Sequence, residues 1–223
     1  MDNPKQSALR FPLTRILGSV ANVKTLRELV RHGGELSAPS VCIRTGLSTR
    51  AVQLSLRALE EMNVIRSLGS GRTRLYRRRR SHPLSQILVD LFRQEENRFD
   101  SIVGKVREAA EACHPQLMAA WIYGSVSRGK DRPDSDLDIA LVVSPETATR
   151  VEYLVREALL PAEEEFVFHA SVVTLDTKDV IQLSSQSDPL WTGLRNDAMT
   201  ILGDSPEVLL TRLLRANDKA MVE

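Results

Sequence analysis

The stretch 121–143 constrains the fold of this chain more than any other part of the sequence. An apolar run ends at Gly124-Ser125, and after a polar loop two aspartates, Asp136 and Asp138, alternate with apolar residues. This alternation predicts a strand, and residues two apart on a strand share one face, roughly 6.6 Å apart along it. We therefore expect two strands joined by a tight turn and a loop, with two carboxylates on one side.

These residue types suit a phosphate and a metal ion. Glycine lets backbone approach a ligand closely, and a serine hydroxyl with backbone N–H groups can hold a phosphate. Arg128 adds positive charge a few residues after Gly124-Ser125. Two neighbouring carboxylates repel each other, and Mg²⁺ is typically held by one or two carboxylates together with substrate phosphates. The sequence thus predicts that Asp136 and Asp138 are ligands of Mg²⁺ or Mn²⁺.

The pattern Gly-Ser-x-x-x-Gly followed by Ser-Asp-x-Asp resembles the DNA polymerase β-like nucleotidyltransferase superfamily. It looks most like the minimal nucleotidyltransferases, related to kanamycin nucleotidyltransferase and to the antitoxin halves of toxin–antitoxin pairs. The resemblance implies that Gly124 and Ser125 bind the phosphates of ATP or another NTP, with Arg128 beside them. It also implies that Asp136 and Asp138 are the catalytic metal ligands.

The resemblance also implies a third carboxylate on a later strand. The expected strand, Phe166–Thr174, contains no acid, and Ser171 aligns with the aspartate of the family. His169 lies two residues before Ser171, so both would point to the same face of the strand, and His169 could act as a base. A histidine on a strand is, however, more often merely packed. Four acids flank this strand: Glu163, Glu164, Glu165 and Asp176.

Two interpretations of the C-terminal region therefore stay open. In the first, the protein transfers NMP from ATP or another NTP to an acceptor, which can be a small molecule, an RNA end or a protein in the manner of an antitoxin and its toxin. In the second, a weak or inactive nucleotidyltransferase fold serves a transcriptional regulator as a nucleotide-sensing or assembly domain. The missing acid favours the second interpretation, and the intact Gly-Ser and Asp-x-Asp pairs favour retained metal–nucleotide binding.

Charge divides the chain into two halves. Residues 1–82 contain 16 lysines and arginines against 5 acids, a net of +11, whereas residues 83–223 contain 14 against 24, a net of −10. Such asymmetry indicates two modules with different partners. The basic half suits a polyanion, because exposed cations bind phosphates by releasing counterions.

The basic half has the order of three helices and a hairpin. Ser37 is expected to cap the second helix and Ser48 or Thr49 the third, and two short strands enclose a Gly-Ser turn. Residues Thr25–Arg80 resemble the winged helix-turn-helix family of ArsR-like or MarR-like regulators. The resemblance implies binding of double-stranded DNA through the third helix and the wing. The expected contacts are Arg50, Gln53, Arg57, Arg72 and Arg74.

We therefore expect an α+β protein with a winged helix-turn-helix domain at 1–82, a helical linker at 83–113 and a nucleotidyltransferase domain at 114–223. The last domain is expected to have a mixed sheet with flanking helices and a helical C-terminus. The apolar stripe of the linker leaves a homodimer open. No apolar run approaches the ~20 residues that span a bilayer, and the start of the chain lacks a secretory pattern. We expect a cytoplasmic location and no membrane partner.

Overall fold

The computed structural model describes residues 7–71, 74–186 and 188–220. The chain forms two compact units, residues 1–97 and 98–223, and the boundary falls within the helix α5 (Ser85–Glu111). Each unit has its own hydrophobic core. Among the described residues, no helix has both the length and the apolar character needed to cross a bilayer.

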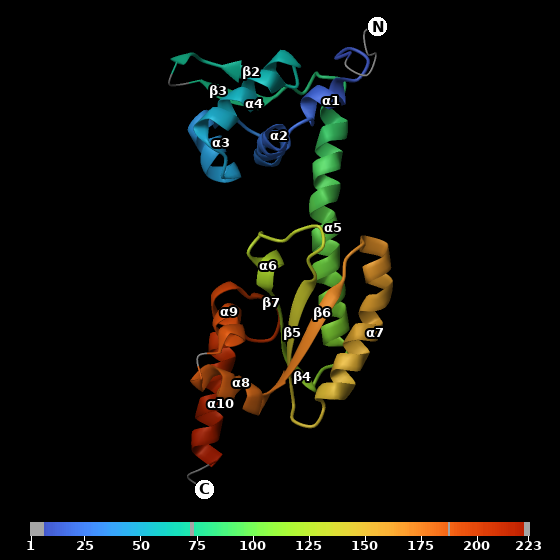
Figure 1. Ribbon diagram of the computed structural model, residues 1–223, viewed down its shortest axis with the longest axis vertical. Coiled ribbons are helices and arrows are strands. Elements are labelled where there is room, and N and C mark those ends of the chain that lie inside the picture. The colour runs from blue at the N-terminus through green and yellow to red at the C-terminus, as the bar shows by residue number, and fades with distance from the viewer. Residues whose placement is uncertain (1–6, 72–73, 187, 221–223) are drawn as a thin grey trace. The chain divides into compact units, whose positions relative to one another are not determined.

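The first unit contains the three expected helices and the hairpin (Figure 1). Its elements are α1 (Pro12–Ile16), α2 (Val20–His32), β1 (Leu36–Ser37), α3 (Ala38–Thr45), α4 (Thr49–Glu61), β2 (Ile65–Leu68), β3 (Leu75–Arg78) and the start of α5. The strands form an antiparallel sheet in the order β1-β3-β2. The short strand β1 was not expected, because two residues carry no readable alternation.

Two predicted caps set the helices of this unit. The Ser37 hydroxyl accepts the backbone N–H of Ser40, and the Ser48 hydroxyl accepts that of Ala51. The helix α2 begins earlier than expected, because Ser19 caps it in the same way. The core then forms from the apolar faces of the helices and the sheet. Its fully buried members include Leu26, Leu29, Val41, Val52, Leu56 and Leu59.

The second unit is built on a four-stranded mixed sheet in the order β6-β5-β4-β7. Its strands are β4 (Leu117–Tyr123), β5 (Leu137–Val143), β6 (Ala170–Asp176) and β7 (Met199–Leu202). Its helices after α5 are α6 (Gly124–Ser127), α7 (Ala148–Phe166), α8 (Thr177–Ser185), α9 (Pro189–Asp197) and α10 (Pro206–Ala220). The central strands β4 and β5 are antiparallel, and β6 runs parallel to β5.

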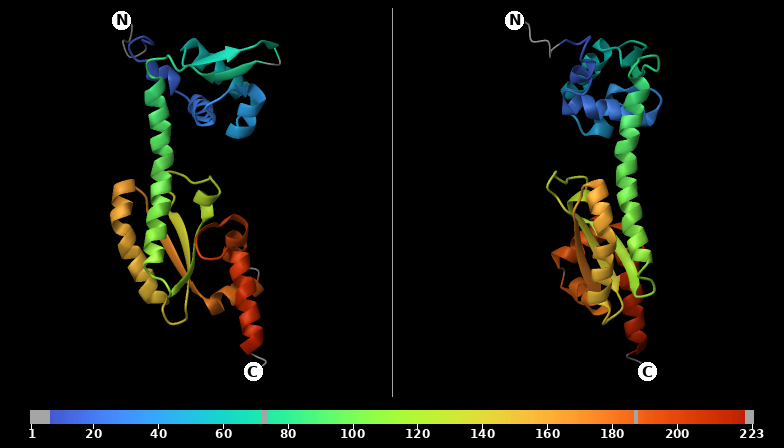
Figure 2. Two further views of the ribbon diagram at one scale, coloured as in Figure 1. Left: turned by 180° about the vertical axis from the view of Figure 1, so that it is seen from behind. Right: turned by 90° about the vertical axis from the view of Figure 1, so that its right-hand side faces the viewer.

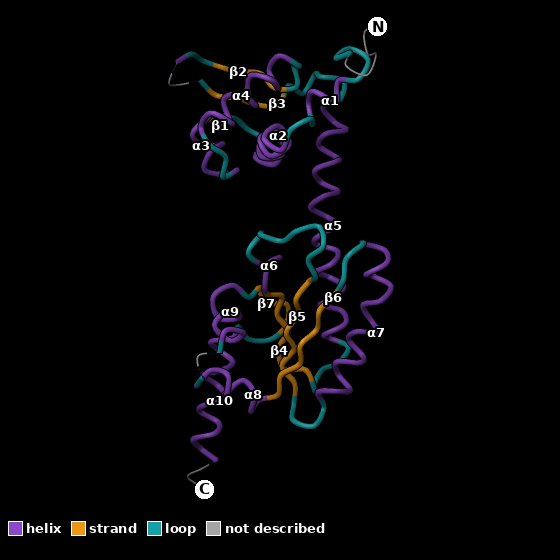
Figure 3. Tube along the Cα trace, viewed as in Figure 1, coloured by secondary structure: helices purple, strands orange, loops and turns teal. Residues whose placement is uncertain are grey.

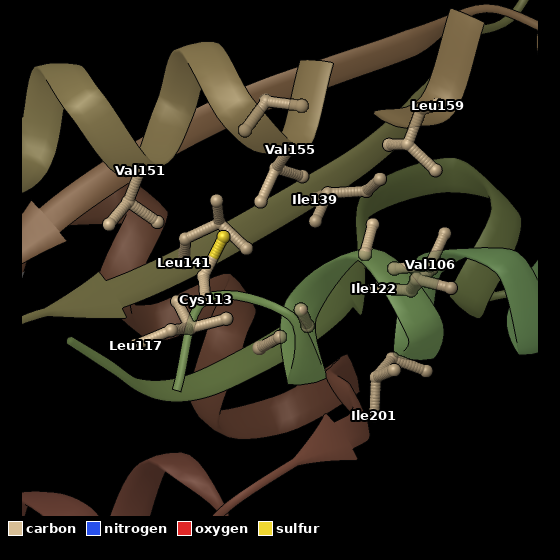
Figure 4. Close-up of a cluster of buried hydrophobic side chains, with 14 of the residues drawn as sticks. Val106, Cys113, Leu117, Ile122, Ile139, Leu141, Val151, Val155, Leu159 and Ile201 are labelled. Carbon is tan, nitrogen blue, oxygen red and sulfur yellow. The ribbon is translucent and has the colours of Figure 1, made fainter. Parts of the chain in front are cut away.

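Helices cover both faces of this sheet (Figures 1 and 2). The end of α5 and the helix α7 pack on one face, where side chains such as Ile139 and Leu141 form the core in Figure 4. The helices α8, α9 and α10 pack on the other face around Trp121 and Trp191, whose rings meet edge to face at 6.4 Å. Because both faces are covered, the central strands are almost entirely apolar, and their polar residues lie at one end.

Two expectations about this unit were wrong in detail. The helix α7 continues through Pro161 to Phe166, so the next strand begins at Ala170 instead of Phe166. The guanidinium of Arg98 donates to the carbonyl oxygens of Phe166 and Val167, which satisfies backbone groups that the helix end leaves without partners. The strand β7 lies in a region expected to be helical, because four apolar residues fit either period.

Candidate functional site

The predicted site lies where three strands of the second unit meet at one end of the sheet. The strand β4 ends at Tyr123, immediately before Gly124-Ser125, and β5 and β6 begin at the same end. Tyr123 and Asp138 are direct neighbours across the β4–β5 pair. The loop between α6 and β5 (Figure 3) brings Asp136 to this end one residue before β5 begins. The structure therefore brings together the turn and the aspartates that the sequence singled out.

Position 124 must be a glycine, because the Asp138 side chain lies directly against its backbone. Its φ of +79° is a conformation that residues with a side chain rarely adopt. A Cβ atom at Gly124 would lie 2.0 Å from the Oδ2 atom of Asp138, far inside van der Waals contact. The glycine thus lets the Asp138 carboxylate lie directly against the backbone of the Gly124-Ser125 turn.

The two aspartates repel each other electrostatically. Partial burial raises the pKa of Asp138, the negative charge of Asp136 raises it further, and Arg128 acts in the opposite direction. Burial and the charge of Asp138 also raise the pKa of Tyr123. A carboxylate pair of this kind favours a bound cation, since the cation would remove the repulsion.

Arg128 follows α6 directly and acts electrostatically on Asp138, but part of its charge is already balanced. Its Nη1 atom lies 3.3 Å from Oδ2 of Asp197, the last residue of α9. This ion pair connects the turn to the helix that covers the neighbouring face. Sequence spacing could not reveal Asp197, because 69 residues separate the two partners.

Among the described residues, the adjacent strand β6 offers no third carboxylate at the end where Asp136 and Asp138 lie. In the parallel β5–β6 pair, Ser171 is the direct neighbour of Asp138. His169 precedes β6 and its side chain is 87% exposed. Of the flanking acids, Glu163 accepts the backbone N–H of Ala170, and Asp176 caps α8 at the other end of the strand.

Among the described residues, no three His, Cys, Asp or Glu side chains come together as metal ligands. The two carboxylates at Asp136 and Asp138 nevertheless fit a hard divalent cation, which accepts one or two carboxylates when substrate phosphates complete its shell. The repulsion that raises the Asp138 pKa supports this fit. The donor set is therefore sufficient for a metal that is bound together with a nucleotide.

A cleft of about 720 Å³ lies beside Asp136, and the sequence did not predict it. It is formed by the loop before β5, the start of the second unit in α5 and the end of α7. Apolar side chains such as Phe99 and Leu160 line part of its wall, and His169 lines another part. Its acidic residues are Asp131, Asp134, Asp136, Glu163 and Glu164. We call it the acid-lined cleft.

The residues predicted to contact DNA lie on the first unit. Arg50, Gln53 and Arg57 are all exposed on α4, and Arg57 pairs with Glu61 one turn away. Arg74 pairs with Glu60, with 2.8 Å between Nη2 and Oε2. Arg72 lies outside the described residues.

The chain was compared with curated proteins, solved structures and family models, and the family match concerns the second unit. No curated protein matches the chain significantly. A crystal structure of a toxin–antitoxin with AMP-PNP shows 16% sequence identity and a TM-score of 0.37, covering 54% of this chain and 90% of that chain. A toxin–antitoxin structure of MntA-HepT shows 13% identity and a TM-score of 0.34, covering 55% of this chain and 90% of that chain. Residues 106–202, less than half of the chain, match the family described as polymerase beta, nucleotidyltransferase, and this part of the protein therefore has the nucleotidyltransferase fold.

Proposed function

We propose that the second unit transfers NMP from ATP or another NTP to an acceptor hydroxyl in the presence of Mg²⁺ or Mn²⁺. The observation that carries this proposal is the contact between Gly124 and Asp138, with Asp136 two residues away. The Asp138 carboxylate thus lies directly against a turn whose residue types suit phosphate groups. The family match over residues 106–202 supports the same chemistry.

Each residue at this end of the sheet has a role in the proposal. Gly124 and Ser125 hold nucleotide phosphates, and among the described residues the Ser125 hydroxyl has no hydrogen-bond partner of its own. Arg128 contributes positive charge beside the phosphates. Asp136 and Asp138 would hold the divalent cation, which when bound stabilises the negative charge that develops on the transferred phosphate.

In the proposed reaction, the acceptor oxygen attacks the α-phosphorus of the nucleotide. The new P–O bond forms as the bond to the β-phosphate breaks, and pyrophosphate leaves. The acceptor proton must pass to a base, and His169 is a candidate because it lines the same cleft as Asp136. We propose that the acceptor enters through the acid-lined cleft, which favours a partly apolar group with positive charge.

A second candidate function follows from Ser171. Where the family has a third carboxylate, this chain has a hydroxyl in register with Asp138. A site with two carboxylates can retain a nucleotide and metal while losing most of its turnover. In this alternative, the fold serves as a nucleotide-sensing or assembly domain of a transcriptional regulator.

We further propose that residues 1–82 form a winged helix-turn-helix domain that binds double-stranded DNA. The element order α2-β1-α3-α4-β2-β3 supports this, as does the exposure of Arg50, Gln53 and Arg57 on α4. The helix α4 would enter the major groove, while Arg72 and Arg74 on the wing would lie near phosphates. Residues 83–113 would then be the linker to the domain at 114–223.

The partners and the location stay proposals as well. An acceptor protein or toxin partner would suit the acid-lined cleft, and a homodimer through the linker region is compatible with the exposed side chains of Ile87 and Leu91 on α5. The cytoplasmic location expected from the sequence stays a prediction.

Labelled ATP tests the transfer reaction. The full chain is incubated with ATP labelled at the α-phosphate, Mg²⁺ and candidate acceptor proteins, and label on the acceptor is measured. We expect Asp136→Asn/Asp138→Asn to abolish transfer, whereas Glu157→Gln, which removes an exposed carboxylate on α7 outside the cleft, leaves it near the wild-type rate. Transfer that survives the double substitution would contradict the assigned site. ATP binding without transfer to any acceptor would favour the sensing function.

Duplex DNA retention at several salt concentrations tests the proposed DNA domain. We expect binding that weakens steeply with salt and that falls in Arg50→Ala/Gln53→Ala. Arg44→Ala is the control, because this residue is exposed on α3 and pairs with Glu28. Unchanged affinity in the double variant would show that α4 does not contact DNA.

A further inference from the structure

The first unit contains a pocket of about 660 Å³ away from the exposed face of α4. It lies at the base of the hairpin, beside the turn that follows α2. The pocket is lined by Gly33, Gly34, Glu35, Ser81 and five arginines: Arg66, Arg77, Arg78, Arg79 and Arg80. We call it the arginine pocket. None of the residues proposed to contact DNA from α4 takes part in it.

The hairpin forces two of these arginines together. Arg66 on β2 and Arg77 on β3 are direct neighbours across the antiparallel pair. The next pair along, Ile65 with Arg78, has Ile65 fully buried, so the Arg66–Arg77 pair occupies the opposite, outer face of the sheet. Like charges directly opposite each other destabilise a sheet. The fold holds this repulsion in place, because burial of Ile65 fixes the register of the hairpin.

Acidic groups in the pocket do not balance its charge. Among the described residues, Glu35 is the only acid that lines it, and its Oε1 atom lies 3.3 Å from the Nη1 atom of Arg77. Arg78 donates to Ser85, and Arg79 donates to the amide oxygen of Asn63, both neutral partners. Within the part of the chain that the structure describes, Arg66, Arg78, Arg79 and Arg80 form no ion pair.

Two arginines elsewhere, one on α4 and one on the hairpin, differ in this respect. Arg57 pairs with Glu61, and Arg74 pairs with Glu60 while stacking on Tyr76. The charges of these two predicted DNA contacts are therefore neutralised within the unit, whereas Arg50 on α4 forms no ion pair among the described residues. The arginine pocket brings four further arginines without an acidic partner together in one place.

From these observations we infer that the arginine pocket is a binding site for a phosphate group. A guanidinium is planar, keeps its charge and matches phosphate oxygens with paired N–H donors. A phosphate between Arg66 and Arg77 would convert their repulsion into two attractions. The phosphate belongs either to a duplex backbone or to a free nucleotide. The site depends neither on Asp136 and Asp138 nor on the α4 contacts, so its failure and theirs are distinguishable.

The test compares Arg66→Ala/Arg80→Ala with Arg31→Ala/Arg93→Ala in the full chain. Both variants remove two exposed arginines from the first unit, but Arg31 and Arg93 pair with Glu96 and Asp90 outside the pocket. Inorganic phosphate is added first, and the melting temperature is followed. We expect phosphate to raise the melting temperature of the wild type and of the control, but not that of the pocket variant.

Binding assays then identify the source of the phosphate. If it is a duplex backbone, the pocket variant loses about tenfold in DNA affinity, and the slope of log affinity against log salt falls by about 2. If it is a free nucleotide, ATP without divalent cations still binds Asp136→Asn/Asp138→Asn but not the pocket variant. The proposal is overturned if phosphate stabilises all three proteins equally, or if the control variant loses as much affinity as the pocket variant.

Discussion

The two units differ in how their charged side chains are arranged. The second unit holds two like charges close together, whereas the first unit pairs several of its charges. At the end of the second sheet, Asp136 and Asp138 repel each other, and close packing against Gly124 keeps the Asp138 carboxylate in place. On the first unit, many more charges lie on the surface, and several arginines are neutralised by neighbours such as Glu60 and Glu61. In the second unit the site is defined by shape, whereas in the first it is defined by which charges are left without partners.

This difference determines how far the site of each unit can be predicted from the sequence. Because Gly124 must leave room for the Asp138 carboxylate, the glycine and the aspartates stand at a fixed spacing. The turn and the aspartate pair are therefore visible as a motif in the sequence. An ion pair between residues distant in sequence leaves no such pattern. The arginine count of residues 1–82 therefore indicates a polyanion partner but does not indicate which arginines bind it.

The largest expected effect is that of Gly124→Ala. The new Cβ would displace the Asp138 carboxylate, and we expect nucleotide affinity to fall by roughly 10- to 100-fold. Gly129→Ala is the matched control, because Gly129 also has a positive φ, +61°, but a Cβ there meets nothing within 4 Å. Isothermal titration with a non-hydrolysable nucleotide and Mg²⁺ measures both variants. An equal loss in both would mean that backbone strain matters and the contact with Asp138 does not.

An intermediate effect is expected from Ser171→Asp, which places a carboxylate beside Asp138. We expect Mg²⁺ affinity in the presence of nucleotide to rise on the order of tenfold, because an added charged ligand strengthens a hard-cation site. The transfer rate should rise as well if the missing acid limits turnover. Ser171→Asn is the control of similar size without charge. If the aspartate and asparagine variants behave alike, position 171 does not contribute to the metal site.

The smallest effect concerns the neutralised charges of the first unit. A hydrogen bond from Ser67 and, after it, the guanidinium of Arg74 lower the pKa of Glu60 below its ordinary value of 4.5. A carboxyl with a lowered folded-state pKa stabilises the fold above its unfolded pKa, and this contribution is lost as the pH falls through the folded-state value. We therefore expect the β2–β3 amides to lose protection from hydrogen exchange as the pH falls below 4.5.

In Glu60→Gln this loss should be smaller, because no carboxylate remains to be protonated at that position. Glu61→Gln is the control, since this exposed carboxylate pairs with Arg57 on the surface of the same helix. The same pH dependence in the wild type and in Glu60→Gln would show that the Glu60–Arg74 pair contributes no stability. In that case Arg74 would be available to phosphates. The wing and the arginine pocket would then differ less in how far their arginines are neutralised.

Much of the fold could be predicted from local patterns. Capping by Ser37 and Ser48 depends on neighbouring residues alone, and both caps are present in the structure. The end of α7 was missed because its stabilising contact, from Arg98, comes from 68 residues away. The strands β1 and β7 were missed because pairing with other strands, and not their own few residues, defines them.

By itself, the sequence determined the Gly-Ser turn and the Asp-x-Asp pair, because their spacing is set by the geometry of one strand and one turn. The resemblance aligned Ser171 with a carboxylate of the family, and the strand register shows Ser171 beside Asp138. Only the tertiary structure decided that Gly124 touches Asp138, that Arg128 shares its charge with Asp197, and that unpaired arginines gather in one pocket. These features are contacts between distant segments, and folding alone brings such segments within range of steric and electrostatic forces.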